Sequence, residues 1–188
     1  MRIITGTARG ARLKAPKGLD TRPTADRVKE SLFSILGERV RGARVLDLFA
    51  GTGSLGLEAL SRGAASAVFV DRATVSVIRE NAVHTHLLAS AQFLRQDVLT
   101  ALPRLVAAGE EFDLVFCDPP YETGLWQRVL LALDRFPLLS PEALVVVERG
   151  AAEKELPPFS TLVWQRTVRY GRTTQILILE SREAEQEA

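Results

Sequence analysis

The stretch DLFAGTGSLG, residues 47–56, holds glycines at a G-x-G-x-x-G spacing, Gly51, Gly53 and Gly56, directly after an apolar run. Glycines there let the backbone approach a ligand, and a helix that follows them presents free N–H groups. Asp71 closes the next apolar run, 20 residues after Gly51, where it can accept hydrogen bonds from ribose hydroxyls. The spacing predicts a site for a cofactor that carries adenosine, either NAD or S-adenosylmethionine. A purely structural tight turn is the alternative.

Two further acids help to separate these cofactors. Asp47 lies inside the apolar run before the glycines, where a dehydrogenase normally has an apolar residue. Its carboxylate suits the amino group of a methionine moiety and would be poorly placed beside a pyrophosphate. Asp97 ends the third apolar run, where it can accept from an adenine amino group or cap the following helix, and both roles stay open.

A second chemical motif, DPPY, ends the fourth apolar run at Asp118, Pro119, Pro120 and Tyr121. Prolines can simply terminate a strand. The alternative is catalytic: an exocyclic amine of a nucleobase is a poor nucleophile because its lone pair is delocalised into the ring. Asp118 and a carbonyl of the proline turn can each accept one N–H, which aims the developing lone pair at a sulfonium methyl, while Tyr121 stacks on the base. Catalysis would then rest on orientation and electrostatics.

The charge distribution indicates a polyanionic partner. The chain has a net charge of +1, but residues 1–44 carry +7 and the remainder carries −6. Lys and Arg contacts to phosphate supply affinity that does not depend on sequence. A solvated, charged extension is the alternative explanation.

These motifs need a sheet to bring them together. Strands are expected at 44–49, 67–71, 91–97, 113–118 and 143–149, with two longer ones on either side of Gly171. Their alternation with helices predicts an α/β fold: a Rossmann-like, mostly parallel, doubly wound sheet with an antiparallel last strand. Ligands of such sheets bind at the carboxyl ends of the strands. Pro103 predicts that the helix after the third strand starts late or is kinked.

The chain before this sheet has a different character. Residues 2–14 predict a short basic β-hairpin, and a helix follows with Thr24 as its N-cap and Val28, Leu32, Ile35 and Leu36 on its apolar face. We therefore expect a basic N-terminal extension over 1–40, a catalytic domain over 41–181 and a polar tail over 182–188.

Other classes of protein fit the composition poorly. Of the 188 residues, 46% are hydrophobic and 25% charged, which is ordinary for a globular domain. A single cysteine, without a Cys/His cluster, predicts neither a disulfide nor a metal site. No apolar run has the roughly 20 residues of a membrane helix, so we expect a cytoplasmic protein without membrane contact, and a monomer. Trp126 and Trp164 are expected to pack rather than bind.

Four motifs together carry a family resemblance. GTARGARL (6–13), RPTADRVKESLF (22–33), DLFAGTGSLGLEALSRGA (47–64) and DPPY (118–121) resemble the bacterial RsmD family of class I S-adenosylmethionine-dependent methyltransferases, from about Ile3 to Glu180. The resemblance implies methyl transfer from S-adenosylmethionine to N2 of one guanine in 16S ribosomal RNA, either naked or in an assembling 30S particle.

The resemblance also implies roles for residues by position. The cofactor site would comprise Asp47, Phe49, Ala50, Gly51, Thr52, Gly53, Ser54, Asp71, Arg72, Asp97 and Val98. The catalytic loop would be Asp118, Pro119, Pro120 and Tyr121. RNA contacts would come from Arg9, Arg12, Lys14, Arg22, Thr24 and Arg27. The chain departs from the family pattern at Ala11, where a second basic residue is common, and at Asp71, where many members have glutamate.

Four other functions remain as alternatives. An adenine-N6 methyltransferase also uses DPPY, but it usually carries a larger target-recognition region. A protein-glutamine methyltransferase more often has asparagine before the prolines and would not need the basic hairpin. An NAD-dependent oxidoreductase accounts only for the glycines and Asp71, and a non-catalytic RNA-binding protein accounts only for the basic extension.

Overall fold

The computed structural model describes residues 1–15, 26–120, 123–152 and 156–182. Its strands are β1 (Arg44–Leu48), β2 (Ser66–Val70), β3 (Ala91–Leu94), β4 (Phe112–Cys117), β5 (Leu139–Gly150), β6 (Leu162–Tyr170) and β7 (Thr174–Ser181). Its helices are α1 (Asp26–Leu36), α2 (Ser54–Ser61), α3 (Val75–His84), α4 (Val98–Ala107) and α5 (Leu125–Arg135), with short 3₁₀ turns η1 (Gly37–Val40) and η2 (Leu88–Ser90).

The seven strands form one sheet in the order β3-β2-β1-β4-β5-β7-β6. β1 to β5 pair in parallel, whereas β7 is antiparallel to both β5 and β6. The predicted α/β class, with a mostly parallel sheet and an antiparallel last strand, is confirmed. The strand order reverses between β1 and β4, which is where ligands bind in open α/β sheets.

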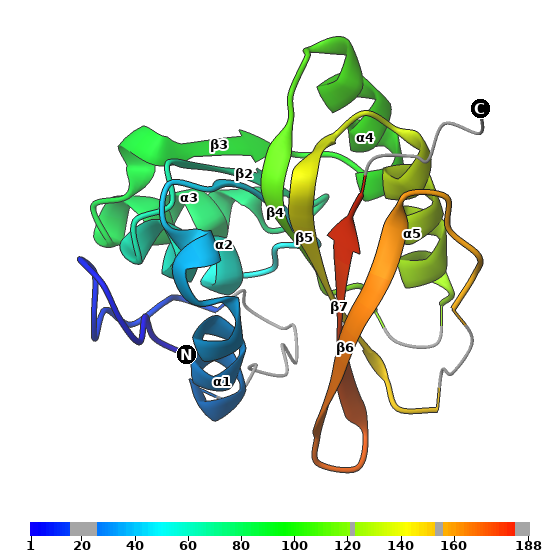
Figure 1. Ribbon diagram of the computed structural model, residues 1–188. Helices are drawn as coiled ribbons and strands as arrows, with labels where there is room; N and C mark the ends of the chain where they lie inside the picture. The colour runs from blue at the N-terminus through cyan, green and yellow to red at the C-terminus, as the bar shows by residue number, and fades with distance from the viewer. Residues whose placement is uncertain (16–25, 121–122, 153–155, 183–188) are drawn as a thin grey trace.

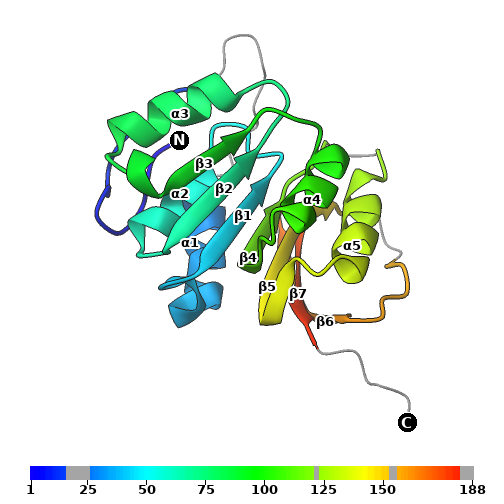
Figure 2. The same cartoon turned by 90° about the horizontal axis from the view of Figure 1, so that it is seen from above.

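Helices cover both faces of the sheet, with α1, α2 and α3 on one side and α4 and α5 on the other (Figures 1 and 2). Side chains alternate along each strand, so each face builds its own core. Val45 and Phe116 belong to the cluster under α1 to α3, and Leu46 and Val115 belong to the cluster under α4 and α5. Because the inner strands are buried on both faces, the ends of those strands are left to bind ligands.

Residues 1–14, the N-terminal segment, form a turn-rich loop instead of the two strands of the predicted hairpin. One antiparallel bridge joins Arg2 and Arg12. The segment instead packs onto α2: a Cβ on Gly6 would lie 1.7 Å from the carbonyl oxygen of Ser61, so this contact requires glycine. Ile3 is fully buried in the core beneath it. Backbone hydrogen bonds from Ile3 N to Ala11 O, Gly10 N to Ile3 O and Leu13 N to Met1 O join the two arms of the segment. The predicted hairpin is therefore present in a reduced form, and contacts with α2 hold it on the body.

Two further expectations concern the start of α4 and the packing of the tryptophans. The helix that contains Pro103 does not start late, because Asp97 caps α4 directly at Val98. Trp126 is buried as expected, but Trp164, on the edge strand β6, is 52% exposed, so the expectation that it packs is wrong. Thr24 and most of the polar tail lie outside the described residues. Within the described part, no helix is long and apolar enough to cross a membrane.

Candidate functional site

A cavity of about 490 Å³ opens at the carboxyl ends of the strands, on both sides of the switch point between β1 and β4. Every predicted cofactor residue except Gly53 lines it, as do Asp118, Pro119 and Pro120. Tyr121 lies outside the described residues. The fold thus brings to one cavity the two motifs that lie about 70 positions apart in the sequence.

The three glycines of the loop after β1 have different structural roles. Gly51 and Gly53 adopt left-handed conformations, with φ of 57° and 76°, and Gly53 occupies the N-cap position of α2 behind the cavity. Gly56 allows helix and sheet to pack, because a Cβ there would lie 2.4 Å from a ring carbon of Phe69. Phe49 lines the cavity with φ of 57°, a conformation that costs a non-glycine residue about 1–2 kcal/mol.

Asp71 links the end of β2 to the glycine loop. Its Oδ2 accepts a hydrogen bond from Gly51 N at 3.1 Å, and its Oδ1 accepts from Ala73 N and Thr74 N at 2.8 and 2.9 Å. Each carboxylate oxygen has two lone pairs, so acceptor capacity remains toward the cavity. The carboxylate is therefore held in place before any ligand is bound.

Asp47 is buried at the base of the cavity, with only 2% of its surface exposed. Its Oδ2 accepts from Gly56 N at 2.9 Å. Burial raises the pKa of Asp47 to about 7, and the negative charge of Asp71 adds to this rise, while the hydrogen bond from Gly56 opposes it. A cation in the cavity would favour the ionised form of this carboxyl group.

The β3 side of the cavity combines a cap with buried polar atoms. Asp97 caps α4 by accepting from Leu99 N at 2.9 Å, and it also lines the cavity, so the two roles proposed for it are compatible. Thr74 Oγ1 and Gln96 Oε1 are buried at this wall without a hydrogen-bond partner among the described residues. Buried polar atoms without partners are costly. A ligand with hydroxyl and amino groups would satisfy them, and the sequence reading missed both residues.

The other wall is acidic and carries the DPPY turn. Asp118 follows β4, and the register of β4 and β5, with Cys117 opposite Val147, places Glu148 beside it. Burial and the negative charges of Glu148 and Asp47 raise the pKa of Asp118 well above its usual range. The sequence reading missed Glu148, because only the strand register brings it to the cavity.

A hydrogen bond from the side chain of Thr123 holds the Pro119–Pro120 turn. Thr123 Oγ1 donates to the carbonyl oxygen of Pro120 at 2.8 Å. Pro119 is buried and Pro120 is exposed. Because the Pro120 carbonyl already accepts this bond and Pro119 lines the cavity, the Pro119 carbonyl is the better candidate to accept an N–H from a ligand.

A buried ion pair supports the glycine loop from behind. Lys29 Nζ lies 3.3 Å from Glu58 Oε2, with both side chains fully buried, and it donates to Ser54 Oγ at 3.0 Å. Glu58 in turn accepts from the backbone N–H groups of Ile4 and Thr5 at 2.8 and 3.0 Å. Burial lowers the pKa of Lys29, and Glu58 opposes that change. The pair thus joins α1, α2 and the N-terminal segment at the start of the helix that faces the cavity.

Asn81 makes a second such connection from α3. Its Nδ2 donates to the carbonyl oxygens of Lys14 and Thr52, at 3.0 and 2.9 Å, and its Oδ1 accepts from Lys14 N at 2.8 Å. Asn81 is fully buried. The N-terminal segment and the glycine loop are therefore held by the same side chain, which the sequence reading did not single out.

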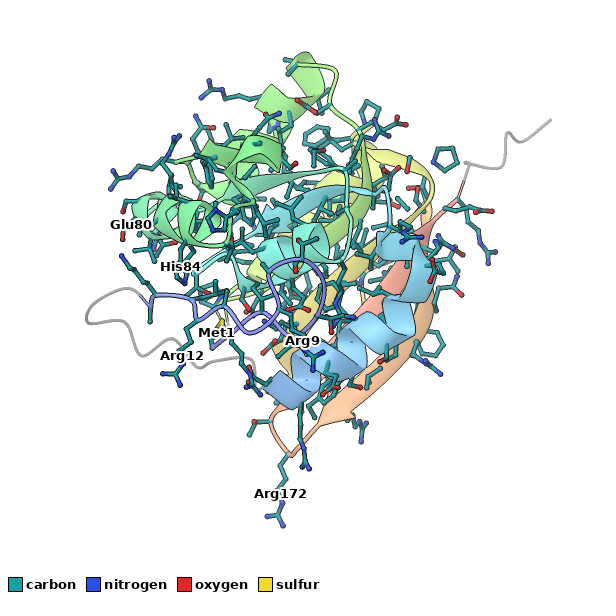
Figure 3. The ribbon with its side chains drawn as sticks, turned by 90° about the vertical axis from the view of Figure 1, so that its left-hand side faces the viewer. Met1, Arg9, Arg12, Glu80, His84 and Arg172 are labelled. Carbon is teal, nitrogen blue, oxygen red and sulfur yellow. The ribbon has the colours of Figure 1, made fainter. Side chains whose placement is uncertain are left out.

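The predicted RNA-binding residues differ in how much charge they offer. Arg9, Arg12 and Arg27 are exposed, and none of them forms an ion pair with another described residue. Lys14 is exposed but pairs with Glu80 at 2.9 Å. Figure 3 shows Arg9 and Arg12 on the N-terminal segment, on one side of the molecule. The remaining two candidates, Arg22 and Thr24, lie outside the described residues.

No group of three or more His, Cys, Asp or Glu side chains suited to a metal ion occurs in residues 1–15, 26–120, 123–152 and 156–182. Comparisons with known proteins add an independent line of information. Residues 1–179 match a family model described as conserved hypothetical protein 95.

Three similar proteins align with this chain over most of both sequences. The Bacillus subtilis YlbH protein is 40% identical over 92% of this chain and 95% of its own. Ribosomal RNA small subunit methyltransferase D of Escherichia coli is 38% identical over 84% of this chain and 78% of its own. The solved structure of the Escherichia coli yhhF protein has a TM-score of 0.82 and 34% identity, and covers 97% of this chain and 98% of its own.

Proposed function

This chain belongs to the RsmD family, described as conserved hypothetical protein 95, and on that premise we propose that it methylates N2 of one guanine in 16S ribosomal RNA, at a site of the position-966 type. The methyl donor in this proposal is S-adenosylmethionine. The observation that carries the proposal is the shared cavity, in which the glycine loop and the Asp118-Pro119-Pro120 turn meet. We place the protein in the cytoplasm and expect a monomer.

The cavity fits the proposed cofactor. Asp71 and the unpartnered Thr74 hydroxyl suit ribose hydroxyls, and Gln96 and Asp97 suit the adenine amino group. Asp47 suits the α-amino group of the methionine moiety. The other predicted cofactor residues would form the wall around it. When bound, S-adenosylmethionine supplies an activated methyl group on a sulfonium centre.

The residues of the chain would orient the substrate amine. The Asp118 carboxylate and the Pro119 carbonyl each accept one N–H of the guanine amino group, which turns the nitrogen lone pair toward the donor site. As the nitrogen gains positive charge, the carboxylates of Asp118 and Glu148 stabilise it electrostatically. Asp118 then accepts the proton that the nitrogen loses, and its raised pKa suits it to hold that proton. Tyr121 would stack on the flipped base.

The extension over 1–40 would contact RNA, and residues 41–181 would form the catalytic domain. Arg9, Arg12 and Arg27 are exposed cations suited to phosphate. Lys14, whose charge is shared with Glu80, would contribute less. Arg22 and Thr24 remain predicted contacts near the mouth of the cavity.

The test uses 16S ribosomal RNA from a strain that lacks this gene, with labelled S-adenosylmethionine. We expect label in one guanine, as N2-methylguanine; N6-methyladenine would instead establish the adenine alternative. Asp118→Ala should reduce kcat by about 100- to 1000-fold, the loss typical of one electrostatic group in an active site, while cofactor affinity stays within about twofold. Glu38→Ala, which removes an exposed carboxylate far from the cavity, is the matched control. Binding of NAD without binding of S-adenosylmethionine would overturn the proposal.

A further inference from the structure

The hairpin formed by β6 and β7 carries a basic surface outside the RNA contacts proposed above. Residues 166–175 include Arg166, Arg169 and Arg172 but no Asp or Glu. All three arginines are exposed, and none forms an ion pair with another residue that the structure describes. Positive charge is therefore concentrated at one end of this hairpin without local compensation.

Strand register places that end beside the candidate active site. Glu148, which lines the cavity, pairs with Ile176 of β7, and Gly150 pairs with Thr174. The chain therefore continues past the cavity edge into the β6–β7 turn. Arg172 lies in the turn two residues before β7 begins at Thr174, and Thr174 pairs with Gly150, two residues after Glu148. Figure 1 shows the hairpin projecting from the body on the same side as α1.

The turn itself forms a hollow suited to an anion. A depression of about 290 Å³ is lined by Ala151, Arg169, Gly171, Arg172, Thr174 and Gln175. Ala151 N donates to Thr173 O at 2.9 Å, which ties the turn to the end of β5, and Gly171 closes the turn with φ of 64°. Two guanidinium groups that flank one hollow can each offer paired N–H donors to a phosphate. In Figure 3, Arg172 projects from the tip of the hairpin, beyond Arg9 and Arg12.

From these observations we infer that the tip of the β6–β7 hairpin is a second RNA-contacting surface, in which Arg169 and Arg172 bind backbone phosphates next to the target nucleotide. The inference rests on the proposed function, because the partner is the proposed RNA substrate. The N-terminal segment lies on the β1–β2 side of the cavity and the hairpin lies on the β5 side. An enzyme that takes a base out of its stack must hold the backbone around it, and contacts on both sides of the cavity would do so.

The test measures binding of the same 16S ribosomal RNA by Arg169→Ala/Arg172→Ala over a series of salt concentrations. Each lost phosphate contact lowers the slope of log K against log salt by about 0.7–0.9. We therefore expect the slope to fall by about 1.4–1.8 and the affinity near 0.15 M salt to fall by about 10- to 30-fold. Affinity for S-adenosylmethionine should stay within about twofold, which also shows that the variant is folded.

The matched control is Arg104→Ala/Arg135→Ala, which removes the same charge from the last turns of α4 and α5. Helices that return antiparallel to the strands end at the opposite edge of the sheet, so this control should bind RNA within about twofold of the wild type. Equal affinity and slope for the hairpin variant and the control would overturn the inference, as expected if an acidic protein occupied the hollow. If the wild type binds RNA but transfers no methyl group, the proposed function fails, and a binding loss confined to the hairpin variant still supports this surface.

Discussion

Asp71 and Asp118 follow the two strands that flank β1, yet their carboxylates have opposite surroundings. After β2, Asp71 accepts three backbone N–H groups from the loops around it. After β4, burial and the negative charges of Glu148 and Asp47 raise the pKa of Asp118 well above its usual range. One carboxylate is fully supported by the fold, whereas the other is held in an unfavourable electrostatic environment.

The cavity therefore has two halves, one around the glycine loop and Asp71 and one between β4 and β5 around Asp118, and the two halves interact differently with a ligand. The glycine-loop half is organised in advance by hydrogen bonds and by the buried pair of Lys29 and Glu58 behind it. The half between β4 and β5 gathers acidic groups that a ligand with N–H donors or developing positive charge would stabilise. Strongly perturbed carboxyl groups in a cavity are typical of sites that do chemistry. The contrast supports our proposal that the cofactor binds in the first half and that methyl transfer takes place in the second.

The largest effect is expected from removing the buried ion pair that supports the glycine loop. Lys29→Met removes one partner of a buried ion pair, while Glu58 keeps a second cation, Arg62, whose Nε lies 2.8 Å from its Oε1. Loss of one partner costs about 3–5 kcal/mol when the remaining charge is left uncompensated. Because Arg62 remains, we expect the free energy of unfolding to fall by about 3 kcal/mol, the lower end of that range, in denaturant titrations. Because Lys29 also contacts Ser54, affinity for S-adenosylmethionine should fall as well.

Lys14→Met provides the matched control for this prediction. It makes the same chemical change in an exposed pair, in which the Lys14 and Glu80 side chains are 66% and 56% exposed. Exposed pairs contribute at most about 1 kcal/mol. Equal losses in the free energy of unfolding from the two variants would show that the glycine loop does not depend on the buried pair. The two halves of the cavity would then not differ in how firmly the fold supports them.

Much of this architecture could be predicted from local patterns. Apolar runs indicated the strands, and the glycine spacing indicated the loop. Asp97 was interpreted as a cap or as an adenine contact, and its position at both α4 and the cavity accommodates both. The strands, the glycine loop and the Asp97 cap are confirmed because each depends on residues that are close in sequence, and the adenine contact stays a prediction.

The rest could not be predicted, because it depends on partners distant in sequence. Within the sequence DRVKESLF, Lys29 cannot be distinguished from a solvent-exposed lysine. Its buried partner, Glu58, lies 29 positions later and is identified only in the folded structure. Glu148 follows an apolar run and reaches the cavity only through the register of β4 and β5. Trp164 was expected to pack, but β6 is an edge strand and leaves it 52% exposed.

An intermediate effect is expected at Asp47, which lies on β1 between the two halves. Its pKa is about 7 in the protein without a ligand, because burial disfavours the carboxylate. A bound α-amino cation favours the ionised form, so affinity for S-adenosylmethionine should rise about tenfold from pH 6 to pH 8, as the ionised fraction does. Calorimetric titration between pH 6 and pH 8 measures this affinity. Asp47→Asn should bind more weakly and without this pH dependence; a wild-type affinity that is flat with pH would remove Asp47 from the cofactor site.

The stability of the unliganded protein should change with pH in the opposite direction. A carboxyl group with a raised pKa contributes stability in full below its unfolded pKa, near 3.8, and loses it as the pH rises through about 7. Asp118 acts in the same direction. The free energy of unfolding without cofactor should therefore fall from pH 6 to pH 8, while cofactor affinity rises. A free energy of unfolding that rises from pH 6 to pH 8, in parallel with the affinity for S-adenosylmethionine, would mean that burial does not raise the pKa of either carboxyl group.

The smallest effect tests the acidic half directly. Glu148→Gln removes a negative charge beside Asp118 and so makes Asp118 easier to ionise. Because the proposed methyl transfer needs the Asp118 carboxylate, the acidic limb of the kcat profile should move to lower pH, by up to about 1 unit. Glu111→Gln, which makes the same change at the far end of β4, should leave the profile in place. A shift confined to Glu148→Gln would establish that charge crowding distinguishes this half from the half around Asp71. Identical profiles would mean that burial alone, and not the charge of Glu148, sets the pKa of Asp118.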